Sequence, residues 1–351
     1  MSTKRSWMVI GALAVVAGCG GGGSVDGDAG SADSGPRPSV DASAEDGDAT
    51  ASADASTEEP DAGSTGWRTE PPLPEAIQEI TGAVHEGRLW IAGGFDAATA
   101  VTRAVRIFDP ATETWSSGPE LPAPRHHAMM VSTGAELFLF GGMATLAFEP
   151  LDTAWVLRSG ASEWTPITSL PEDRASGVAA LVGDRVVIAG GNARGGLART
   201  TLIYDPAADD WEIGAEIPDR REHTSGFAHD GELWVVAGRR NSLETNRTTV
   251  DVYDPETDTW RSGPPIPTAR GGHGVAVLDG VAYAVGGEQP DRALDSVEAL
   301  DLATGEWRAV APTITPHHGH VVLAAEGRIW VIGGGDRPIF AAVDAVESFA
   351  P

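Results

Sequence analysis

The sequence contains a single cysteine, Cys19, and a single lysine, Lys4, and all its other basic residues are arginines. One cysteine excludes a disulfide scaffold and any metal site built on several thiolates. Positive charge is scarce, with 24 Lys+Arg against 51 Asp+Glu and a formal net charge of −27. Because neutralising phosphates requires a basic surface, this balance argues against nucleic-acid binding. Hydrophobic residues make up 41% of the chain, which is enough for a folded core.

The N-terminal apolar segment is too short to cross a membrane. It covers residues 7–18 after Lys4 and Arg5, whereas a spanning helix needs about 20 residues. We interpret it as an export signal. Its end, Val16-Ala17-Gly18-Cys19, resembles the lipobox of bacterial lipoproteins. The resemblance implies cleavage before Cys19, acylation of that residue and a lipid anchor in the bacterial cell envelope. An ordinary secretory signal with an incidental cysteine is the alternative.

Residues 20–66 are predicted to form a disordered tether. They contain no aromatic residue and carry eleven acidic residues against Arg37, so they offer too little apolar surface to fold. The residue after Cys19 is Gly20, whereas an Asp at this position would resemble an inner-membrane retention signal. We therefore favour the outer membrane, on its periplasmic or surface side. We therefore expect three parts: a signal peptide (1–19), the tether (20–66) and a folded domain (67–351).

One structural unit repeats six times in the folded domain. Tryptophan recurs at intervals of 47 to 49 residues, and a glycine pair or a near-copy of it recurs at the same pace. The tryptophans are Trp67, Trp115, Trp164, Trp211, Trp260 and Trp307. The pairs are Gly93-Gly94, Gly141-Gly142, Gly190-Gly191, Ala237-Gly238, Gly286-Gly287 and Gly333-Gly334. We expect the glycines to serve backbone geometry and the tryptophans to pack between units.

Each unit is predicted to contain four antiparallel strands, A to D, joined by short links. In the second unit these are 128–133, 136–142, 151–157 and 163–169. An Asp-Pro turn stands six residues before the tryptophan, as at Asp109 and Asp254. An apolar strand, Gly-Gly, an aromatic residue before Asp-Pro and then Trp together resemble the kelch repeat. The resemblance covers residues 67–351 and implies an all-β, six-bladed propeller.

The way the ring closes can also be predicted. The last unit ends at Pro351 without a strand D, whereas the segment at Trp67 is a strand D without the rest of its unit. We therefore expect residues 66–72 to complete the sixth blade. A single closed ring also explains why a chain of this length forms one large domain instead of two.

The main candidate site is a ring of basic side chains. In a four-stranded meander the D–A and B–C links share one face, and the sequence places thirteen arginines in those links. Ten residues after successive tryptophans stand Arg125, Arg174, Arg221, Arg270 and His317, with Ile77 in the remaining unit. His127 and His223 follow two residues after Arg125 and Arg221. We expect these groups to point into a funnel and bind an anion; the alternative is that the arginines pair with acids of adjacent blades.

No catalytic motif or cofactor site stands out. No phosphate-binding loop, dinucleotide fingerprint or metalloprotease motif occurs in a supporting context. Kelch propellers include copper radical oxidases, which need a Tyr–Cys crosslink that a chain with only Cys19 does not provide in the propeller. The segment His317-His318-Gly319-His320 offers imidazoles that suit a transition metal, but a polar substitution in a strand is the simpler interpretation. We therefore predict no cofactor.

Three functions from different classes remain open. The leading hypothesis is a lipid-anchored, monomeric binding module for an acidic peptide, an acidic protein or an anionic glycan. The second is a sugar mutarotase or epimerase, because exported kelch propellers include a type that acts on sialic acids; its candidate residues are Arg221, Glu222 and His223. The third is a structural scaffold in the cell envelope. A binder is favoured over an enzyme.

Overall fold

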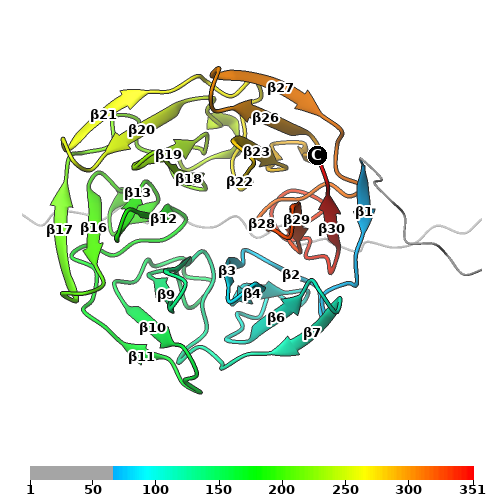
Figure 1. The fold of residues 1–351 in the computed structure, drawn as a ribbon, viewed down its shortest axis with the longest axis horizontal. Coiled ribbons are helices and arrows are strands. Elements are labelled where there is room, and N and C mark those ends of the chain that lie inside the picture. Colours follow the sequence, from blue (N-terminus) through cyan, green and yellow to red (C-terminus); the bar gives the residue numbers. More distant parts are fainter. Residues whose placement is uncertain (1–65) are drawn as a thin grey trace, which may run out of the picture. The chain divides into compact units, whose positions relative to one another are not determined.

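A ring of six four-stranded antiparallel sheets forms the folded domain (Figure 1). The computed structural model describes residues 66–351, so the predicted signal peptide, Cys19 and nearly the whole tether lie outside the described residues. The six-bladed all-β fold predicted from the repeat is confirmed. In the described part of the chain, no helix is long and apolar enough to span a membrane.

The strands of each blade run from the axis outward in the order A, B, C, D. The inner A strands are β3 (Thr81–His85), β8 (Met129–Ser132), β12 (Val178–Val182), β18 (Ser225–His229), β22 (Gly274–Leu278) and β28 (Val321–Ala325). The B strands are β4 (Arg88–Ala92), β9 (Glu136–Phe140), β13 (Arg185–Ala189), β19 (Glu232–Val236), β23 (Val281–Val285) and β29 (Arg328–Ile332). In this order they belong to blades 1 to 6.

The C strands are as buried as the B strands, and only the outermost D strands are largely exposed. The C strands are β6 (Val105–Asp109), β10 (Ala154–Arg158), β16 (Thr201–Asp205), β20 (Val250–Asp254), β26 (Val297–Asp301) and β30 (Val346–Phe349). The D strands are β7 (Thr114–Ser117), β11 (Thr165–Pro166), β17 (Asp210–Gly214), β21 (Thr259–Ser262), β27 (Glu306–Val310) and, for blade 6, β1 (Trp67–Thr69). The links add β2 (Ile77–Gln78), β5 (Phe95–Asp96), β14 (Asn192–Ala193), β15 (Gly196–Leu197), β24 (Glu288–Gln289), β25 (Arg292–Ala293) and the 3₁₀ turn η1 (Leu243–Thr245).

The strands of the second blade are shorter than predicted. Strand B ends at Phe140 instead of Gly142, because Gly141 and Gly142 take positive φ values of 58° and 83° that leave the extended conformation. Strand D is reduced to Thr165–Pro166, because the proline has no N–H to donate to a ladder. The order and pairing of the four strands are as predicted.

The glycine pairs make the contact between neighbouring blades. The N–H of the second residue in each pair donates to a carbonyl of the next blade around the ring, at distances of 2.7 to 2.9 Å. These bonds join Gly94 to Arg125, Gly142 to Arg174, Gly191 to Arg221, Gly238 to Arg270, Gly287 to His317 and Gly334 to Ile77. A Cβ on Gly141 would lie 2.0 Å from the Arg174 carbonyl oxygen, so a side chain at that position would collide with the backbone of the next blade.

The six tryptophans also join neighbouring blades, as predicted. Each indole N–H donates, over 2.8 to 3.1 Å, to a carbonyl four residues after the tryptophan of the preceding blade. The acceptors for Trp67, Trp115, Trp164, Trp211, Trp260 and Trp307 belong to Ala311, Pro71, Pro119, Thr168, Ala215 and Pro264. Apolar clusters fill the space between the sheets, and one of them packs Trp90 of blade 1 against Met130 and Trp155 of blade 2.

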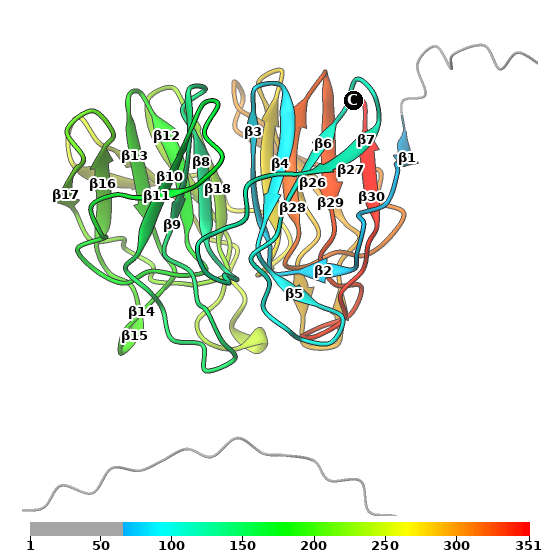
Figure 2. The same cartoon turned by 90° about the horizontal axis from the view of Figure 1, so that it is seen from below.

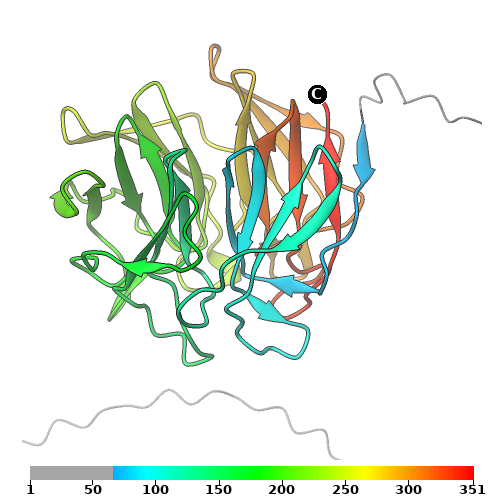
Figure 3. The same cartoon turned by 60° about the horizontal axis from the view of Figure 1, so that its bottom comes forward.

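The N-terminal strand closes the ring as predicted. Strand β1 pairs antiparallel with β30, with Trp67 opposite Phe349 (Figure 1, Figure 3). Their rings stack with centroids 5.2 Å apart. The first and last strands of the domain therefore belong to one sheet, and blade 6 has four strands like the other blades.

Candidate functional site

The D–A and B–C links lie on one face of the ring, which we call the funnel face. In every blade a residue of the D–A link pairs with a residue of the following B–C link, so the two links meet at the same end of the sheet. These pairs are Gln78–Phe95, His126–Met143, Ala175–Asn192, Glu222–Arg239, Gly271–Glu288 and His318–Gly335. Figure 2 shows β2, β5, β14 and β15 together on this face.

Two cavities meet on the axis of the propeller. The funnel, with a volume of about 380 Å³, opens on the funnel face. The channel, of about 400 Å³, continues between the inner strands. Glu79, His127 and His223 line both cavities. These three side chains therefore form the boundary between the funnel and the channel.

The predicted ring of basic groups does not point into the funnel, and this corrects the expectation from the sequence. Arg174, Arg221, Arg270 and His317 are fully buried, and Arg125 is 4% exposed. Ile77, at the equivalent position of blade 1, is also fully buried. None of these residues lines the funnel. Anion binding by this ring stays an untested prediction, and the burial favours the alternative that its members pair within the fold.

The buried ring satisfies backbone oxygen atoms of its own blades. Arg174, Arg221, Arg270 and His317 each donate to the carbonyl of the first residue in a glycine-pair position, namely Gly190, Ala237, Gly286 and Gly333. Each also contacts a carboxylate, from Glu172, Asp251, Glu298 and Glu347 respectively. Their pairing is thus within one blade, whereas the alternative considered in the sequence analysis placed the partners in adjacent blades.

Arg125 departs from this pattern. Its guanidinium donates to Thr153 Oγ1 at 2.8 Å and lies 4.2 Å from the centroid of the Trp155 ring. Burial lowers the pKa of Arg125 to about 10, and burial also lowers that of Arg174 to about 10 despite the nearby Glu172. Both groups keep their charge near neutral pH. Arg125 is therefore a buried cation that an aromatic face stabilises in place of a carboxylate.

The residues that follow the basic-ring positions by two in the sequence form a second ring around the axis. It consists of Glu79, His127, Ser176, His223, Gly272 and Gly319, one residue from each blade, and we call it the inner ring. All six have φ between 47° and 65°. Five of the six N–H groups donate to the carbonyl of the preceding member over 2.6 to 3.1 Å; the donors are Glu79, His127, Ser176, Gly272 and Gly319. Four members thus hold side chains in a left-handed conformation that glycine adopts without cost.

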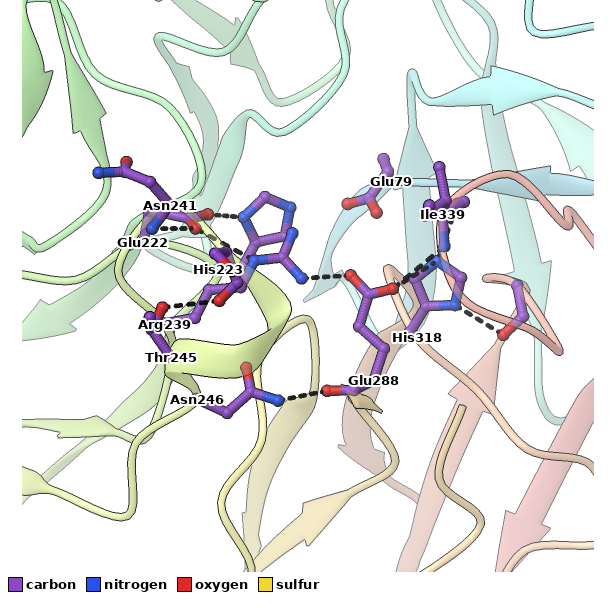
Figure 4. Close-up of polar contacts among 12 residues, drawn as sticks. Glu79, Glu222, His223, Arg239, Asn241, Thr245, Asn246, Glu288, His318 and Ile339 are labelled. Carbon is purple, nitrogen blue, oxygen red and sulfur yellow. Dashed lines mark hydrogen bonds and ion pairs between the residues drawn. The ribbon is translucent and has the colours of Figure 1, made fainter. Parts of the chain in front are cut away.

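A charged network forms one wall of the funnel. Arg239 Nε donates to Glu222 Oε1 over 3.1 Å, and its Nη1 bonds Glu288 Oε1 (Figure 4). Glu288 is 3% exposed, accepts from the Ile339 N–H over 3.1 Å and lies 3.7 Å from His318 Nε2. Arg239 is therefore already paired on both sides, so it is poorly placed to take up a further anion.

His127 and His223, which the sequence analysis selected, do face the axis together. Their Nε2 atoms are 3.0 Å apart, and His127 Nε2 lies 3.1 Å from Glu79 Oε2. Burial, and next to it the charge of Arg239, lowers the pKa of His127 to about 3. The same two causes hold the pKa of His223 well below its ordinary value. Both imidazoles are neutral at pH 7, and with Glu79 they place three potential metal ligands within 4.8 Å of one another.

The other histidines of the predicted metal segment do not converge. His317 Nδ1 bonds the Gly333 carbonyl, and His318 bonds the carbonyls of Gly335 and Ile339. His320 is buried with a pKa well below its ordinary value, because of its burial and then the neighbouring His317. Two of these three imidazoles are therefore committed to backbone carbonyls and do not form a shared site.

An apolar rim stands beside the funnel. Phe148, Ile339 and Phe340 are 44%, 61% and 47% exposed and line the funnel from the B–C links of blades 2 and 6. Phe95 of blade 1 is buried between them, with its ring centroid 6.2 Å from that of Phe148 and 5.6 Å from that of Phe340. Large exposed apolar side chains that gather around a cavity are typical of a binding surface.

Sequence reasoning missed Glu79, Glu288 and the apolar rim. Glu79 carried a usable signal, because it follows Trp67 by twelve residues, as His127 follows Trp115 and His223 follows Trp211. Its blade lacks the arginine that marks the others, and the equivalent position there is Ile77. The rim residues belong to links of irregular sequence, which contain no repeat from which their position could be inferred.

Comparisons with known proteins agree with this fold. The family model described as Attractin/LZTR1 beta-propeller matches residues 89–341, which is well over half of the chain. Kelch-like protein 38 of Homo sapiens is 26% identical over 180 residues, which cover 51% of this chain and 30% of that protein. Kelch-like protein 23 of Homo sapiens is 31% identical over 136 residues, or 38% of this chain and 24% of that protein. The chain thus spans less than a third of these curated relatives.

A solved structure has the same architecture. The structure of YjhT superimposes with a TM-score of 0.68 at 15% sequence identity, covering 79% of this chain and 95% of that one. At this level of identity the similarity shows the fold alone.

Arg270→Gln tests the structural role of the buried basic ring. We expect it to lower the free energy of unfolding by about 3–5 kcal/mol, because it leaves Glu298 and three carbonyls without their buried cation. The measurement is urea unfolding followed by tryptophan fluorescence. Arg292→Gln is the matched control, since Arg292 lies in the same blade with an exposed side chain and should cost less than about 0.5 kcal/mol. Equal stability of the two variants would contradict the assignment.

Proposed function

This chain belongs to the Attractin/LZTR1 β-propeller family, and from that premise we propose that it is a binding module that holds a partner protein segment on its funnel face. The observation that carries the proposal is the apolar rim. Phe148, Ile339 and Phe340 expose large side chains next to a cavity on one face, where they lose contact with water when a partner covers them. The curated relatives are named Kelch-like proteins, which supports a kelch-type module.

The partner proposed here combines an apolar anchor with an acidic group. The funnel itself suits the apolar part, because its arginine, Arg239, is already paired with Glu222 and Glu288. An acidic group finds arginines farther out, where Arg194, Arg199, Arg220 and Arg240 line a groove of about 1210 Å³ on the same face. Three of them pair with Asp173, Glu216 and Asp219, so Arg220, which makes no ion pair among the described residues, is the best placed to meet a ligand carboxylate. An anionic glycan is the alternative occupant of this groove. We therefore place the binding of an acidic group in the outer groove instead of at the buried basic ring.

The partner-binding proposal predicts a specific loss of affinity. We would select peptides from a displayed random library against the purified protein and measure their binding by calorimetry. Phe148→Ser and Phe340→Ser are each expected to weaken binding at least about tenfold, because an aromatic side chain no longer contacts the partner. Ile213→Ser removes an even more exposed apolar side chain from the outer strand β17 and should leave the affinity unchanged. Peptides that bind all three variants alike would refute the funnel face as the binding surface.

A sugar-handling enzyme is the second candidate, and one contact favours it. Glu222 touches His223 Nδ1 at the funnel wall, and this carboxylate–imidazole pair could move a proton within a cavity large enough for a monosaccharide. Arg221, which the sequence suggested for binding the substrate carboxylate, is fully buried against Asp251, so Arg239 would have to take that role.

Anomer exchange separates the two candidates. If the chain is a mutarotase, it accelerates the interconversion of the anomers of N-acetylneuraminic acid, followed by NMR from a pure anomer, and Glu222→Gln abolishes the acceleration. If it is a binder, the exchange rate equals that of the buffer. Heat-denatured protein is the control for catalysis by traces of base.

The envelope location is part of the proposal and rests on the lipobox-like sequence at Cys19. Several acyl chains on one residue make a stable anchor, so the protein should sediment with membranes when it is expressed in a bacterium that processes lipoproteins. Cys19→Ser should move it to the soluble fraction. Membrane association that survives this substitution would refute the anchor. Purely structural scaffolding of the envelope remains the interpretation if neither ligands nor anomer exchange are observed.

A further inference from the structure

Three ligand atoms lie within 4.8 Å of one another at the boundary between funnel and channel, and two of the distances among them match a metal site. Two ligands that each lie about 2.1 Å from one ion are about 3.0–3.4 Å apart when the angle between them is 90° to 109°. The distance between His127 Nε2 and His223 Nε2 is 3.0 Å, and that between His127 Nε2 and Glu79 Oε2 is 3.1 Å. The set of two imidazoles and one carboxylate suits zinc and similar divalent transition-metal ions.

The hydrogen bonds behind the histidines determine which ring nitrogen carries the proton. His126 Nε2 lies 3.1 Å from the Thr145 carbonyl oxygen, which only accepts, so Nε2 is protonated. In the neutral ring, His126 Nδ1 then accepts from His127 Nδ1, 2.5 Å away. His127 Nε2 is therefore left with a lone pair. This assignment follows from the partners, since each neutral imidazole carries one proton.

His223 is oriented in the same way. Its Nδ1 lies against the Glu222 carboxylate, which also only accepts, and a proton on Nδ1 would satisfy this contact and leave the Nε2 lone pair facing the axis. Glu222 is held in turn by Arg239. A carboxylate behind a histidine is the usual arrangement that fixes the tautomer of a metal ligand. Three acceptor atoms, two of them imidazole nitrogens, thus lie close together with no donor among them. A bound cation would remove the repulsion between their lone pairs.

The charges around this point also favour a cation. Glu79, Glu222 and Glu288 bring three carboxyl groups to the funnel, against the single guanidinium of Arg239. Figure 4 shows these groups arranged around one region of the funnel face, with Glu79 opposite the pair of Arg239 and Glu222. The inner ring supplies the positions: Glu79, His127 and His223 are three of the four members that keep a side chain despite a left-handed backbone.

We propose that Glu79, His127 and His223 bind one divalent transition-metal ion, with zinc as the best match, at the boundary between the funnel and the channel. Three protein ligands leave at least one coordination position open, as in zinc sites that also bind water or another ligand. That position faces a cavity. The site would therefore accept an oxygen donor such as water or a carboxylate from a ligand in the funnel. The proposal is independent of whether the apolar rim binds a protein segment.

The test uses the full chain carrying Cys19→Ser, without a histidine tag, so that no thiol or tag competes for metal. We expect equilibrium dialysis to give one Zn²⁺ per chain, and Co²⁺ to produce a visible absorption band of the same stoichiometry that Zn²⁺ abolishes. The double variant His127→Gly/His223→Gly is expected to weaken Zn²⁺ binding at least about 100-fold. Glycine already occupies two positions of the inner ring, Gly272 and Gly319, so the metal-free double variant should fold.

Three further variants make the result decisive. Glu79→Gln should weaken binding at least about tenfold while preserving the shape of the side chain, and Glu222→Gln should weaken it about 10- to 100-fold through the orientation of His223. His229→Ala is the control, because His229 is the most exposed histidine and lies 3.3 Å from Asp230, where an ion could bind adventitiously. The proposal is overturned if the parent chain binds no Zn²⁺, or if Zn²⁺ binding survives in the double variant or is lost in His229→Ala.

Discussion

The hydrogen bond from each glycine-pair position to the next blade is the constraint on which the structure depends. It occurs in all six blades, and its donor is in each of them a glycine with positive φ. The residue before this glycine also has positive φ and is glycine in five blades and Ala237 in the other. The same geometry turns the carbonyl of the first residue in the pair inward, where it needs a donor. In four blades that donor is the buried arginine or His317. The turn that follows strand B thus explains four of the five members of the basic ring, and Arg125 is the exception.

The repeat allowed the fold to be predicted almost completely. The spacing of Trp67 to Trp307, the glycine pairs and the incomplete last unit each report a local requirement that recurs in every blade, and ring closure by β1 follows from them. The direction of Arg174 or Arg270 could not be predicted in this way. A long side chain at a given position of the repeat can extend to the axis or fold back onto its own sheet, and the choice depends on an unpaired carbonyl that only the three-dimensional structure reveals.

The candidate site lies where the six blades differ most. His127 and His223 were identified from the sequence because they follow Arg125 and Arg221 by two residues, and Glu79 was overlooked although it occupies the same position. Blades 5 and 6 have glycine there, so polar side chains surround only one part of the axis. A ligand in the funnel therefore meets an asymmetric environment: the charged wall of Glu222, Arg239 and Glu288 on one side, and Phe148 and Phe340 of the rim on another. The nearly sixfold scaffold thereby presents a one-sided surface to the funnel.

Closure of the ring by its first and last strands has a consequence for how the domain comes apart. In a linear repeat protein the terminal units have one neighbour each and fray first. Here the strand that begins the domain and the strand that ends it lie side by side in blade 6, so every blade has two neighbours. Opening any blade breaks two interfaces at once, and partly unfolded forms gain little entropy in return. The propeller therefore behaves as one cooperative unit despite its modular sequence.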